Sequence, residues 1–223
     1  MLMAAGFGER MLPLTLEIPK PLLKVGSKSL IQHQLEKLAA AEFHEIVINV
    51  SWLGEQIEQA LGDGNALGVS ITYSREEQPL DSAGGILNAL PLLGPEPFLC
   101  VNSDIWTDFP FQTLHAIELK DMLAHLVLVP NPVQHQAGDF VLDETSGLVS
   151  TENTTGNRST FSGIAVYHPD LFSNLTKGKK SIVPLLKNAM TQGKVSGQLF
   201  TGSWEDIGTP ERLKRLDIEL GQS

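Results

Sequence analysis

Apolar runs alternate with segments of helical periodicity along most of the chain. Short continuous runs such as EIVINV predict buried strands, and apolar residues three and four apart, as in LIQHQLEKLAAA, predict amphipathic helices. Ser29 directly precedes the second of these segments and is suited to cap it. In chain order, the predicted elements are helix 30–41, strand 45–50, helix 53–61, strand 69–74, helix 82–93, strand 97–104, helix 113–120, strand 124–130, hairpin 139–150, strand 160–169, helix 182–193, strand 197–208 and helix 210–220.

This order of elements predicts an α/β fold. Strands that alternate with helices at this spacing favour right-handed crossovers and a mostly parallel sheet covered on both faces. The second half departs from that rhythm, because DFVLDETSGLVS alternates and turns at SG, which predicts an antiparallel elaboration. We therefore expect one three-layer α/β domain over residues 1–223, with a mixed and mostly parallel sheet.

Polar clusters follow three of the predicted strands. They are AAGFGER near the start, NSD at 102–104 and WEDIG at 204–208. In open α/β sheets, ligands bind beyond the carboxyl ends of the strands. The three clusters are therefore expected to meet at one site.

The loop AAGFGER is a candidate for binding an anion. Gly6 and Gly8 would let backbone N–H groups approach closely, and the fork of Arg10 can bind two phosphate oxygens. Lys20 adds a second cation, and its flanking prolines restrict the local backbone. The loop matches neither the P-loop nor the dinucleotide-binding pattern. A plain glycine turn and a solvated surface lysine therefore stay open as alternatives.

Two aspartates at predicted strand ends are candidates for a metal site. Asp104 ends the strand in PFLCVNSD and Asp206 ends the one in WEDIG, and neither has an obvious cationic partner nearby in the sequence. Mg²⁺ binds one or two carboxylates together with phosphate oxygens. The pair and the basic loop together favour Mg²⁺, whereas either aspartate alone is more typical of a cap or a loop carboxylate.

The stretch EEQPLDSAGG precedes a predicted helix and is a weaker candidate for a base pocket. Gly84 and Gly85 would let a flat ring lie against the backbone, and Gln78 offers a donor and acceptors to a base edge. A plain helix start explains the same residues.

Composition excludes some classes of partner. A net charge of -10 and a pI near 5.0 argue against nucleic acid, which requires a basic face. No apolar run approaches the length of a membrane span. The single cysteine, Cys100, lies in an apolar run and fits a core residue in a reducing compartment, here the cytoplasm. No pair among the six histidines has zinc-ligand spacing.

The motifs in this order resemble the sugar-1-phosphate nucleotidyltransferases, which make nucleoside-diphosphate sugars. The matching segments span nearly the whole chain, and the opening pair is very specific to that family. They are AAGFGERMLPLT, PKPLLKVG, INVSWLGEQI, LGDGNALGVSITYSREEQPLDSAGGI, FLCVNSD, FSGIAVYHP and WEDIGTPERL. The resemblance implies a Rossmann-like nucleotidyltransferase fold, with a nucleotide-binding half at about 1–108 and a sugar-binding half at about 109–223.

The resemblance also implies a role for each matched residue. Lys20 would bridge the two substrates, Mg²⁺ would be held by Asp104 and Asp206, and Arg10, Lys20 and Asp104 would be catalytic. The implied nucleotide-binding residues are Ala5, Gly6, Gly8, Glu9, Arg10, Lys20, Gln78, Gly84 and Asn102; the implied sugar-binding residues are Asp139, Ser162 and Gly163. The chain departs from the common L-G-T-A-G pattern at LDSAGG, where Ser82 replaces threonine.

The resemblance implies the reaction as well. A sugar 1-phosphate would attack a nucleoside triphosphate and release pyrophosphate. The short length and the segments NSDIWTDF, GDF and TFSGIAV are most similar to the branch that couples UTP to N-acetylmuramic acid 1-phosphate in cell-wall recycling. That sugar carries a carboxylate, for which His135, Gln136 and Arg158 are candidate partners.

Several alternatives stay open. They are transfer of guanylate to mannose 1-phosphate or of thymidylate to glucose 1-phosphate, a glycosyltransferase of similar topology, and a non-catalytic nucleotide-binding subunit. The retention of Arg10, Lys20, Asp104 and Asp206 together argues against the last. The expected partners are small molecules, and the sequence does not indicate an oligomeric state.

Overall fold

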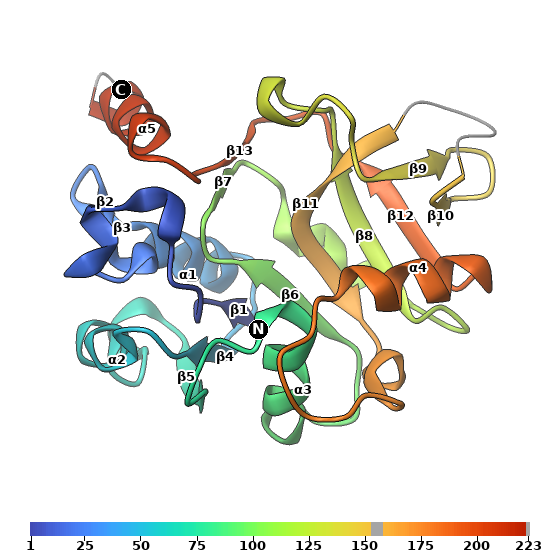
Figure 1. The fold of residues 1–223 in the computed structure, drawn as a ribbon, viewed down its shortest axis with the longest axis horizontal. Helices are drawn as coiled ribbons and strands as arrows, with labels where there is room; N and C mark the ends of the chain where they lie inside the picture. The colour runs from blue at the N-terminus through green and yellow to red at the C-terminus, as the bar shows by residue number, and fades with distance from the viewer. Residues whose placement is uncertain (153–157, 222–223) are drawn as a thin grey trace.

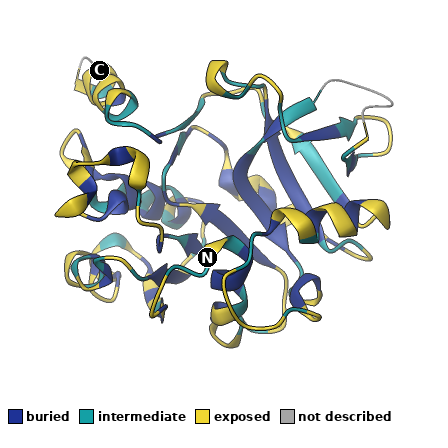
Figure 2. Cartoon of the chain, viewed as in Figure 1, coloured by how far each residue is buried: buried dark blue, intermediate teal, exposed yellow. Residues whose placement is uncertain are grey.

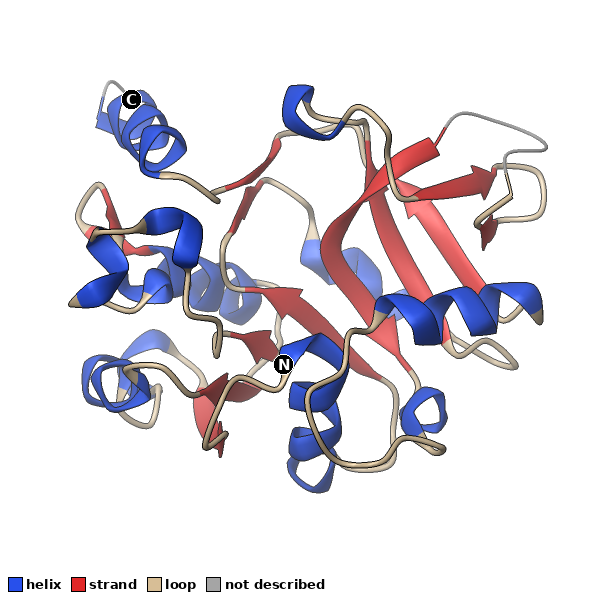
Figure 3. Cartoon of the chain, viewed as in Figure 1, coloured by secondary structure: helices blue, strands red, loops and turns tan. Residues whose placement is uncertain are grey.

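A long mixed sheet runs through the centre of the computed structural model, with helices on both faces (Figures 1 and 3). The structure describes residues 1–152 and 158–221, and within them nine strands form this sheet in the order β5-β4-β1-β6-β11-β8-β12-β10-β9. The strands are β1 (Leu2–Met3), β4 (Glu45–Val50), β5 (Ser70–Arg75), β6 (Phe98–Asn102), β8 (Ala124–Val129), β9 (Phe140–Asp143), β10 (Leu148–Ser150), β11 (Arg158–Tyr167) and β12 (Val195–Leu199).

In the described residues, two small ribbons and five α-helices complete the fold. The ribbons are β2 (Lys24–Val25) with β3 (Lys28–Ser29), and β7 (Ile105–Thr107) with β13 (Trp204–Asp206). The helices are α1 (Leu30–Ala40), α2 (Gly54–Leu61), α3 (Asp81–Leu93), α4 (Val183–Thr191) and α5 (Pro210–Gly221). In the described part of the chain, no helix is long and apolar enough to cross a membrane.

The direction of strand pairing differs between the two halves of the sheet. Strands β5, β4, β1 and β6 pair in parallel, as the alternating pattern predicts. Strand β11 then pairs antiparallel with both β6 and β8, and β9 and β10 form the predicted antiparallel hairpin. The sheet is mixed as predicted, and its second half is more antiparallel than expected, with β12 and β8 as its parallel pair.

Alternating side chains of the strands pack against a helical layer on each face. In β6, Leu99 and Val101 join one apolar cluster, and Phe98 and Cys100 join the other. Helices α1 and α2 contribute to the first cluster, and α3 and α4 to the second, so the predicted three layers are confirmed. The central strands are accordingly the most buried part of the chain (Figure 2).

The start of α1 agrees with the sequence prediction. Ser29 accepts a hydrogen bond from the Gln32 backbone N–H, and the Gln32 side chain accepts one from the Ser29 N–H. This reciprocal capping box fixes the first turn. Ile31, Leu35 and Leu38 follow at spacings of four and three, and all three are buried against the sheet.

Two predicted elements are wrong. Residues 113–120 are not an α-helix; the chain forms a 3₁₀ helix at Phe111–Ala116, whose three-residue turn buries Phe111 and Leu114 together. The single strand predicted at 197–208 is two strands in different sheets. The chain leaves the main sheet after β12 and re-forms as β13, which pairs with β7.

Helix α5 returns the end of the chain to its beginning. Leu216 of α5 and Ile207 pack against Met11, Val25 and Leu30 in a third apolar cluster. Figure 1 shows α5 beside the β2–β3 ribbon, and the backbone N–H of Gly26 there donates to Asp217 at 2.6 Å. This packing holds the segment after β13 close to the opening loop.

Candidate active site

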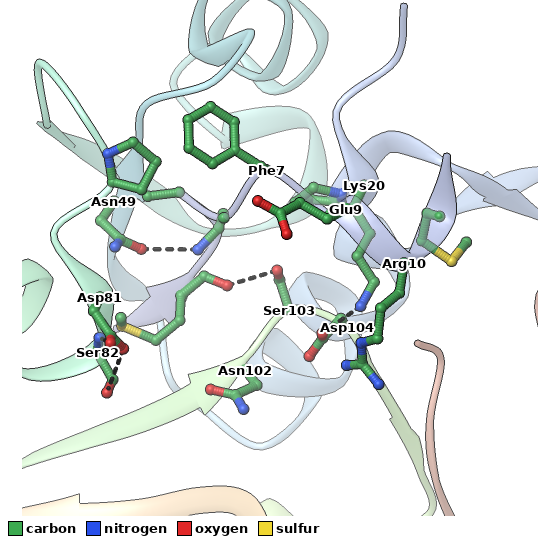
Figure 4. Close-up of a pocket in the computed structure, with 18 of the residues that line it drawn as sticks. Phe7, Glu9, Arg10, Lys20, Asn49, Asp81, Ser82, Asn102, Ser103 and Asp104 are labelled. Carbon is green, nitrogen blue, oxygen red and sulfur yellow. Dashed lines mark hydrogen bonds and ion pairs between the residues drawn. The ribbon is translucent and has the colours of Figure 1, made fainter. Parts of the chain in front are cut away.

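A cleft of about 660 Å³ lies where the parallel strands β1, β4 and β6 end. This is the position at which open α/β sheets bind ligands. Figure 4 shows the opening loop on one side of the cleft and the residues that follow β6 below it. The lining residues include Ala5, Gly6, Gly8, Glu9, Arg10, Lys20, Asn102 and Asp104, all of which the sequence predicted.

The opening loop is held by its backbone. The N–H of Ala4 donates to Asn49 Oδ1 at 2.8 Å, which fixes the loop to the end of β4. Gly8 has a φ of 65°, and a Cβ there would lie 2.9 Å from Thr15 Cγ2 and 3.1 Å from Lys20 Cβ. Within the described residues, Gly6 N–H has no protein partner, and nothing lies within 4 Å of the position that a Cβ at Gly6 would take. The loop therefore presents backbone to the cleft, as an anion-binding loop requires.

Lys20 and Asp104 form an ion pair at the floor of the cleft. Lys20 Nζ lies 2.5 Å from Asp104 Oδ2, and the lysine side chain is only 10% exposed. Pro19 and Pro21 flank the lysine, and its 3₁₀ turn runs to Leu22. The buried position removes the alternative of a solvated surface lysine.

Asp206 reaches the same place from the other end of the chain. Strand β13 pairs with β7 so that Asp206 lies opposite Ile105, and Ile207 N–H donates to the Asp104 carbonyl at 2.9 Å. Two aspartates about a hundred residues apart in sequence are therefore neighbours in the fold.

Both aspartates have cationic partners in the fold, although the sequence shows no obvious one near Asp104. Besides the Lys20–Asp104 pair, Arg212 Nη1 lies 2.9 Å from Asp206 Oδ2, and Arg10 Nη1 lies 3.6 Å from the same oxygen. Arg212 lies on the first turns of α5, which brings it back over the end of β13. A site with two carboxylates and three surrounding cations is suited to anions with many oxygens.

The donor set at the strand ends fits a magnesium ion. Mg²⁺ binds through one or two carboxylates and takes its other ligands from phosphate oxygens and water. Asp104 and Asp206 supply two carboxylates beside a cleft whose basic side chains are suited to phosphate oxygens. In the part of the chain that the structure describes, no group of three or more His, Cys, Asp or Glu side chains could form a closed metal cage.

A second pocket of about 350 Å³ adjoins the cleft. It shares Arg10, Asn102 and Asp104 with the cleft, and Asp206 also lines it. The rest of its lining comes from the β6–β7 turn, the segment after β8, the middle of β11 and β13: Ile105, Pro132, Gln134, His135, Thr160, Phe161, Ser162 and Trp204. The two cavities therefore meet at Arg10, Asn102 and Asp104, and Asp104 is the ion-pair partner of Lys20.

The three predicted sugar residues cluster around the second pocket in different ways. Ser162 lines it, and its Oγ donates to the Val127 carbonyl at 2.7 Å. Gly163, with a φ of 81°, lies behind Asn102, where a Cβ would approach Asn102 Nδ2 to 2.6 Å. Asp139 accepts from the Phe161 N–H at 2.9 Å, and His135 Nε2 lies 3.0 Å from its other oxygen. Gly163 and Asp139 thus position lining residues.

Two of the three candidate partners for a sugar carboxylate do not line the second pocket. Arg158 donates to the carbonyls of Asp139 and Thr151, each at 2.8 Å, so its guanidinium is bound to backbone. Gln136 is absent from the described lining, where Gln134 stands instead. His135 is the candidate that the structure brings to the pocket.

The predicted base-pocket residues are also partly displaced. Gln78 is exposed and does not line the cleft within the described residues. Gly84 is buried, and a Cβ there would collide with the carbonyl of Gly178 and approach Leu80 Cβ to 3.0 Å. Its small size therefore serves close packing of a loop on α3, and a flat ring has no room there. Glu76, Pro79, Asp81 and Ser82 line this end of the cleft.

Sequence reasoning missed Glu76 and Asn49. Glu76 accepts from Asn49 Nδ2 at 2.7 Å and from the Leu80 N–H at 2.8 Å. Burial raises the pKa of the Glu76 carboxyl, and these two hydrogen bonds oppose that rise. Both residues connect the loop of residues 76–80 to the end of β4. A polar side chain inside the apolar run EIVINV was the available signal for Asn49.

The chain belongs to the nucleotidyl transferase family, whose model matches residues 1–222. The resemblance in the motifs is thereby confirmed for nearly the whole chain. Among individual relatives, the N-acetylmuramate alpha-1-phosphate uridylyltransferase of Neisseria meningitidis serogroup B is 50% identical, over 99% of this chain and 97% of its own.

More distant relatives share the fold. The mannose-1-phosphate guanylyltransferase catalytic subunit beta of Drosophila pseudoobscura pseudoobscura is 30% identical over 95% of this chain and 59% of its own. The structure of HddC from Yersinia pseudotuberculosis complexed with GMP-PN superposes with a TM-score of 0.81 at 19% identity, covering 98% of this chain and 97% of the other. The predicted fold class is confirmed.

Proposed function

We propose that the protein transfers a uridylyl group from UTP to N-acetylmuramic acid 1-phosphate and releases pyrophosphate. The observation that carries this proposal is the junction of two cavities at Asp104, whose carboxylate pairs with Lys20. Arg10, Asn102 and Asp104 line both the cleft and the second pocket. A transferase of this kind needs two substrate sites that meet at the reacting phosphorus.

The chemistry requires the attacking phosphate oxygen of the sugar to reach the α-phosphorus of the triphosphate. That oxygen is already ionised, so no general base is needed. Both substrates are anions, and the residues have to hold them together against their repulsion. Lys20 lines the cleft and pairs with Asp104, which lines both cavities, so it would bridge the two phosphates, and Arg10 would bind phosphate oxygens from the loop side.

Asp104 and Asp206 would hold Mg²⁺ at this junction. The ion supplies positive charge to the phosphate oxygens during transfer. Within the chain, Lys20 and Arg212 neutralise these carboxylates and hold them in place, at 2.5 Å and 2.9 Å respectively. We therefore expect Mg²⁺ and the triphosphate to bind together. The ion would offset the negative charge of the two carboxylates and of the phosphate oxygens, and the phosphate oxygens would serve as further ligands of the ion.

The choice of sugar rests on the second pocket and on the 50% identical relative. N-acetylmuramic acid carries a lactyl carboxylate that plain hexoses lack. His135 is half-exposed in the second pocket, and Asp139 accepts from its Nε2 side. With Nε2 directed at Asp139, Nδ1 is the ring nitrogen left to face a substrate carboxylate.

The same proposal extends to the organisation and setting of the enzyme. Residues from about 1–108 would form most of the nucleotide site and residues from about 109–223 most of the sugar site. A role in peptidoglycan recycling in the cytoplasm follows from the sugar. The buried Cys100, whose pKa is raised to about 11 by burial, is consistent with an unreactive core thiol there.

The decisive test is pyrophosphate release across a grid of substrates. N-acetylmuramic acid, N-acetylglucosamine, glucose and mannose 1-phosphates are each combined with UTP, dTTP and GTP. We expect the highest kcat/KM for N-acetylmuramic acid 1-phosphate with UTP. A preference for mannose with GTP, or for glucose with dTTP, would replace the substrates and leave nucleotidyl transfer standing. Nucleotide binding without pyrophosphate release from any pair would favour a regulatory subunit.

A further inference from the structure

We propose that Lys179 is a third phosphate-binding cation of the nucleotide cleft, delivered by a loop from the second half of the chain. The proposal rests on the function proposed above and assigns one more residue to the triphosphate. Lys179 lines the cleft together with Arg10 and Lys20, although more than 150 residues separate it from both.

The loop that carries Lys179 is fixed in place by its backbone. Lys180 N–H donates to the Leu80 carbonyl at 2.9 Å, and the Lys180 carbonyl accepts from Ala83 N–H at 2.9 Å. Ser82 Oγ accepts from the Ile182 N–H at 2.9 Å, so the departure from threonine at this position keeps a hydroxyl where the loop needs one. Gly84 lets the Gly178 carbonyl pack against α3.

These contacts fix the backbone position of Lys179 at the edge of the cleft. Figure 1 shows the segment before α4 passing in front of α3, near the end of the sheet where the cleft opens. The residue itself is exposed, and among the described residues it has no ion pair or hydrogen bond. Its ammonium is therefore free to move toward a ligand over the length of a lysine side chain.

The charges of the cleft show why an unpaired cation matters. Lys20 is paired with Asp104, and Arg10 lies 3.6 Å from Asp206. Four acidic side chains of the described residues line the cleft against three basic ones: Glu9, Glu76, Asp81 and Asp104 against Arg10, Lys20 and Lys179. In a chain of net charge -10, Lys179 is the cation there that no carboxylate already neutralises.

A triphosphate is the ligand that this lysine fits. An ammonium on a flexible stem acts as a point charge and gains most from a multiply charged anion. The second pocket does not include Lys179 among its described lining, so the sugar phosphate is the poorer candidate. The base is uncharged and would draw little on a mobile, exposed ammonium.

The test compares Lys179→Ala with Lys177→Ala. Lys177 lies on the same loop, is also exposed and does not line the cleft. Equilibrium binding of UTP is measured for each variant, and uridine, which has no phosphate, is measured as a competitor. Lys179→Ala should weaken UTP binding about three- to fivefold, as expected for one exposed ion pair. Lys177→Ala should leave it unchanged, and neither variant should alter uridine binding.

Three further readouts make the role specific. Lys179→Arg should restore UTP binding, because a mobile charge is what the position supplies. The loss in Lys179→Ala should shrink as salt is raised, since screening weakens exposed charge pairs. In steady state the substitution should raise KM for UTP and leave kcat nearly unchanged.

Two results would overturn the assignment: UTP binding in Lys179→Ala equal to wild type, or an equal loss for UTP and uridine. These binding measurements do not depend on turnover. A wild-type protein that releases no pyrophosphate would contradict the proposed function while the Lys179 comparison still gave its own answer.

Discussion

The cleft and the second pocket share a wall but are built in different ways. One side of the cleft is the continuous stretch of residues 4–11, joined by Lys20 and Pro21, and its backbone is held by Asn49 and by its own glycines. The second pocket is assembled from side chains on segments far apart in sequence, including Asn102, Phe161 and Trp204. A local loop can be recognised from its amino-acid sequence, whereas the position of a pocket formed by dispersed side chains depends on strand pairing. The two regions should therefore respond differently to substitution.

The largest effect is expected where the two regions meet. Asp104→Asn or Asp206→Asn should lower turnover by several orders of magnitude, because either removes a carboxylate proposed to hold Mg²⁺. Pyrophosphate release as a function of Mg²⁺ concentration is the measurement. Circular dichroism and thermal unfolding serve as controls for folding, since Lys20 or Arg212 would lose its partner. Activity near wild type in a folded variant would remove the metal assignment.

Lys20 should show the next largest effect. Lys20→Ala should reduce kcat/KM by about 2.7–4 kcal/mol, the range for losing one preorganised electrostatic donor. Lys20→Arg should fail to rescue it, because the side chain is nearly buried and its Cβ lies against the position of Gly8. This contrasts with the rescue expected at Lys179. A loss below about tenfold in Lys20→Ala would return this residue to a structural role.

Alanine substitutions at two glycines separate the displacement of Asn102 by an added Cβ from the backbone strain of alanine at positive φ. Gly163→Ala and Gly147→Ala both place a Cβ at positive φ, 81° and 71°. Each should lower stability by about 1–2 kcal/mol. Only Gly163→Ala should also lower kcat/KM by roughly tenfold or more, because its Cβ would displace Asn102, whereas a Cβ at Gly147 would have nothing within 4 Å. Equal activity in the two variants would show that the position of Asn102 is unimportant.

His135 should affect the choice of sugar more than the rate. His135→Gln should lower kcat/KM for N-acetylmuramic acid 1-phosphate roughly fivefold, the size expected for a half-exposed ion pair. The value for N-acetylglucosamine 1-phosphate, which lacks the carboxylate, should stay constant. Parallel kinetics with both sugars provide the check, and a uniform loss would assign His135 a positioning role through Asp139.

The smallest effect is a pH dependence of stability in the second half of the sheet. Burial lowers the pKa of His125 on β8 below its usual 6.5. The unfolded chain therefore takes up this proton at a higher pH than the folded one, so stability should fall as pH drops below about 6.5. His125→Asn, which cannot take up a proton, should reduce that fall in urea titrations between pH 8 and 5. If stability falls between pH 8 and pH 5 by the same amount in His125→Asn as in the wild type, the assignment to His125 is contradicted.

Local interactions explain what the sequence predicted. The capping box at Ser29, the glycine loop and the aspartate after β6 depend on residues within a few positions of one another. The packing of the Gly178 carbonyl on Gly84 could not be predicted, because a glycine on a helix looks the same in sequence whether a ring or a backbone packs on it. Lys179 was missed because its place depends on a loop bound to residues 80–84, about a hundred positions earlier. The division of 197–208 into two strands likewise depends on long-range pairing, of β12 with β8 and of β13 with β7.

The pairing of β13 with β7 also has a consequence for protein synthesis. Asp206 is translated about a hundred residues after Asp104, and Ile207 N–H bonds to the Asp104 carbonyl once both are present. A nascent chain that has emerged only as far as β12 has the glycine loop, Lys20 and Asp104 but neither Asp206 nor Arg212. Nucleotidyl transfer is therefore expected only after α5 has left the ribosome, and nascent chains that lack α5 should be inactive.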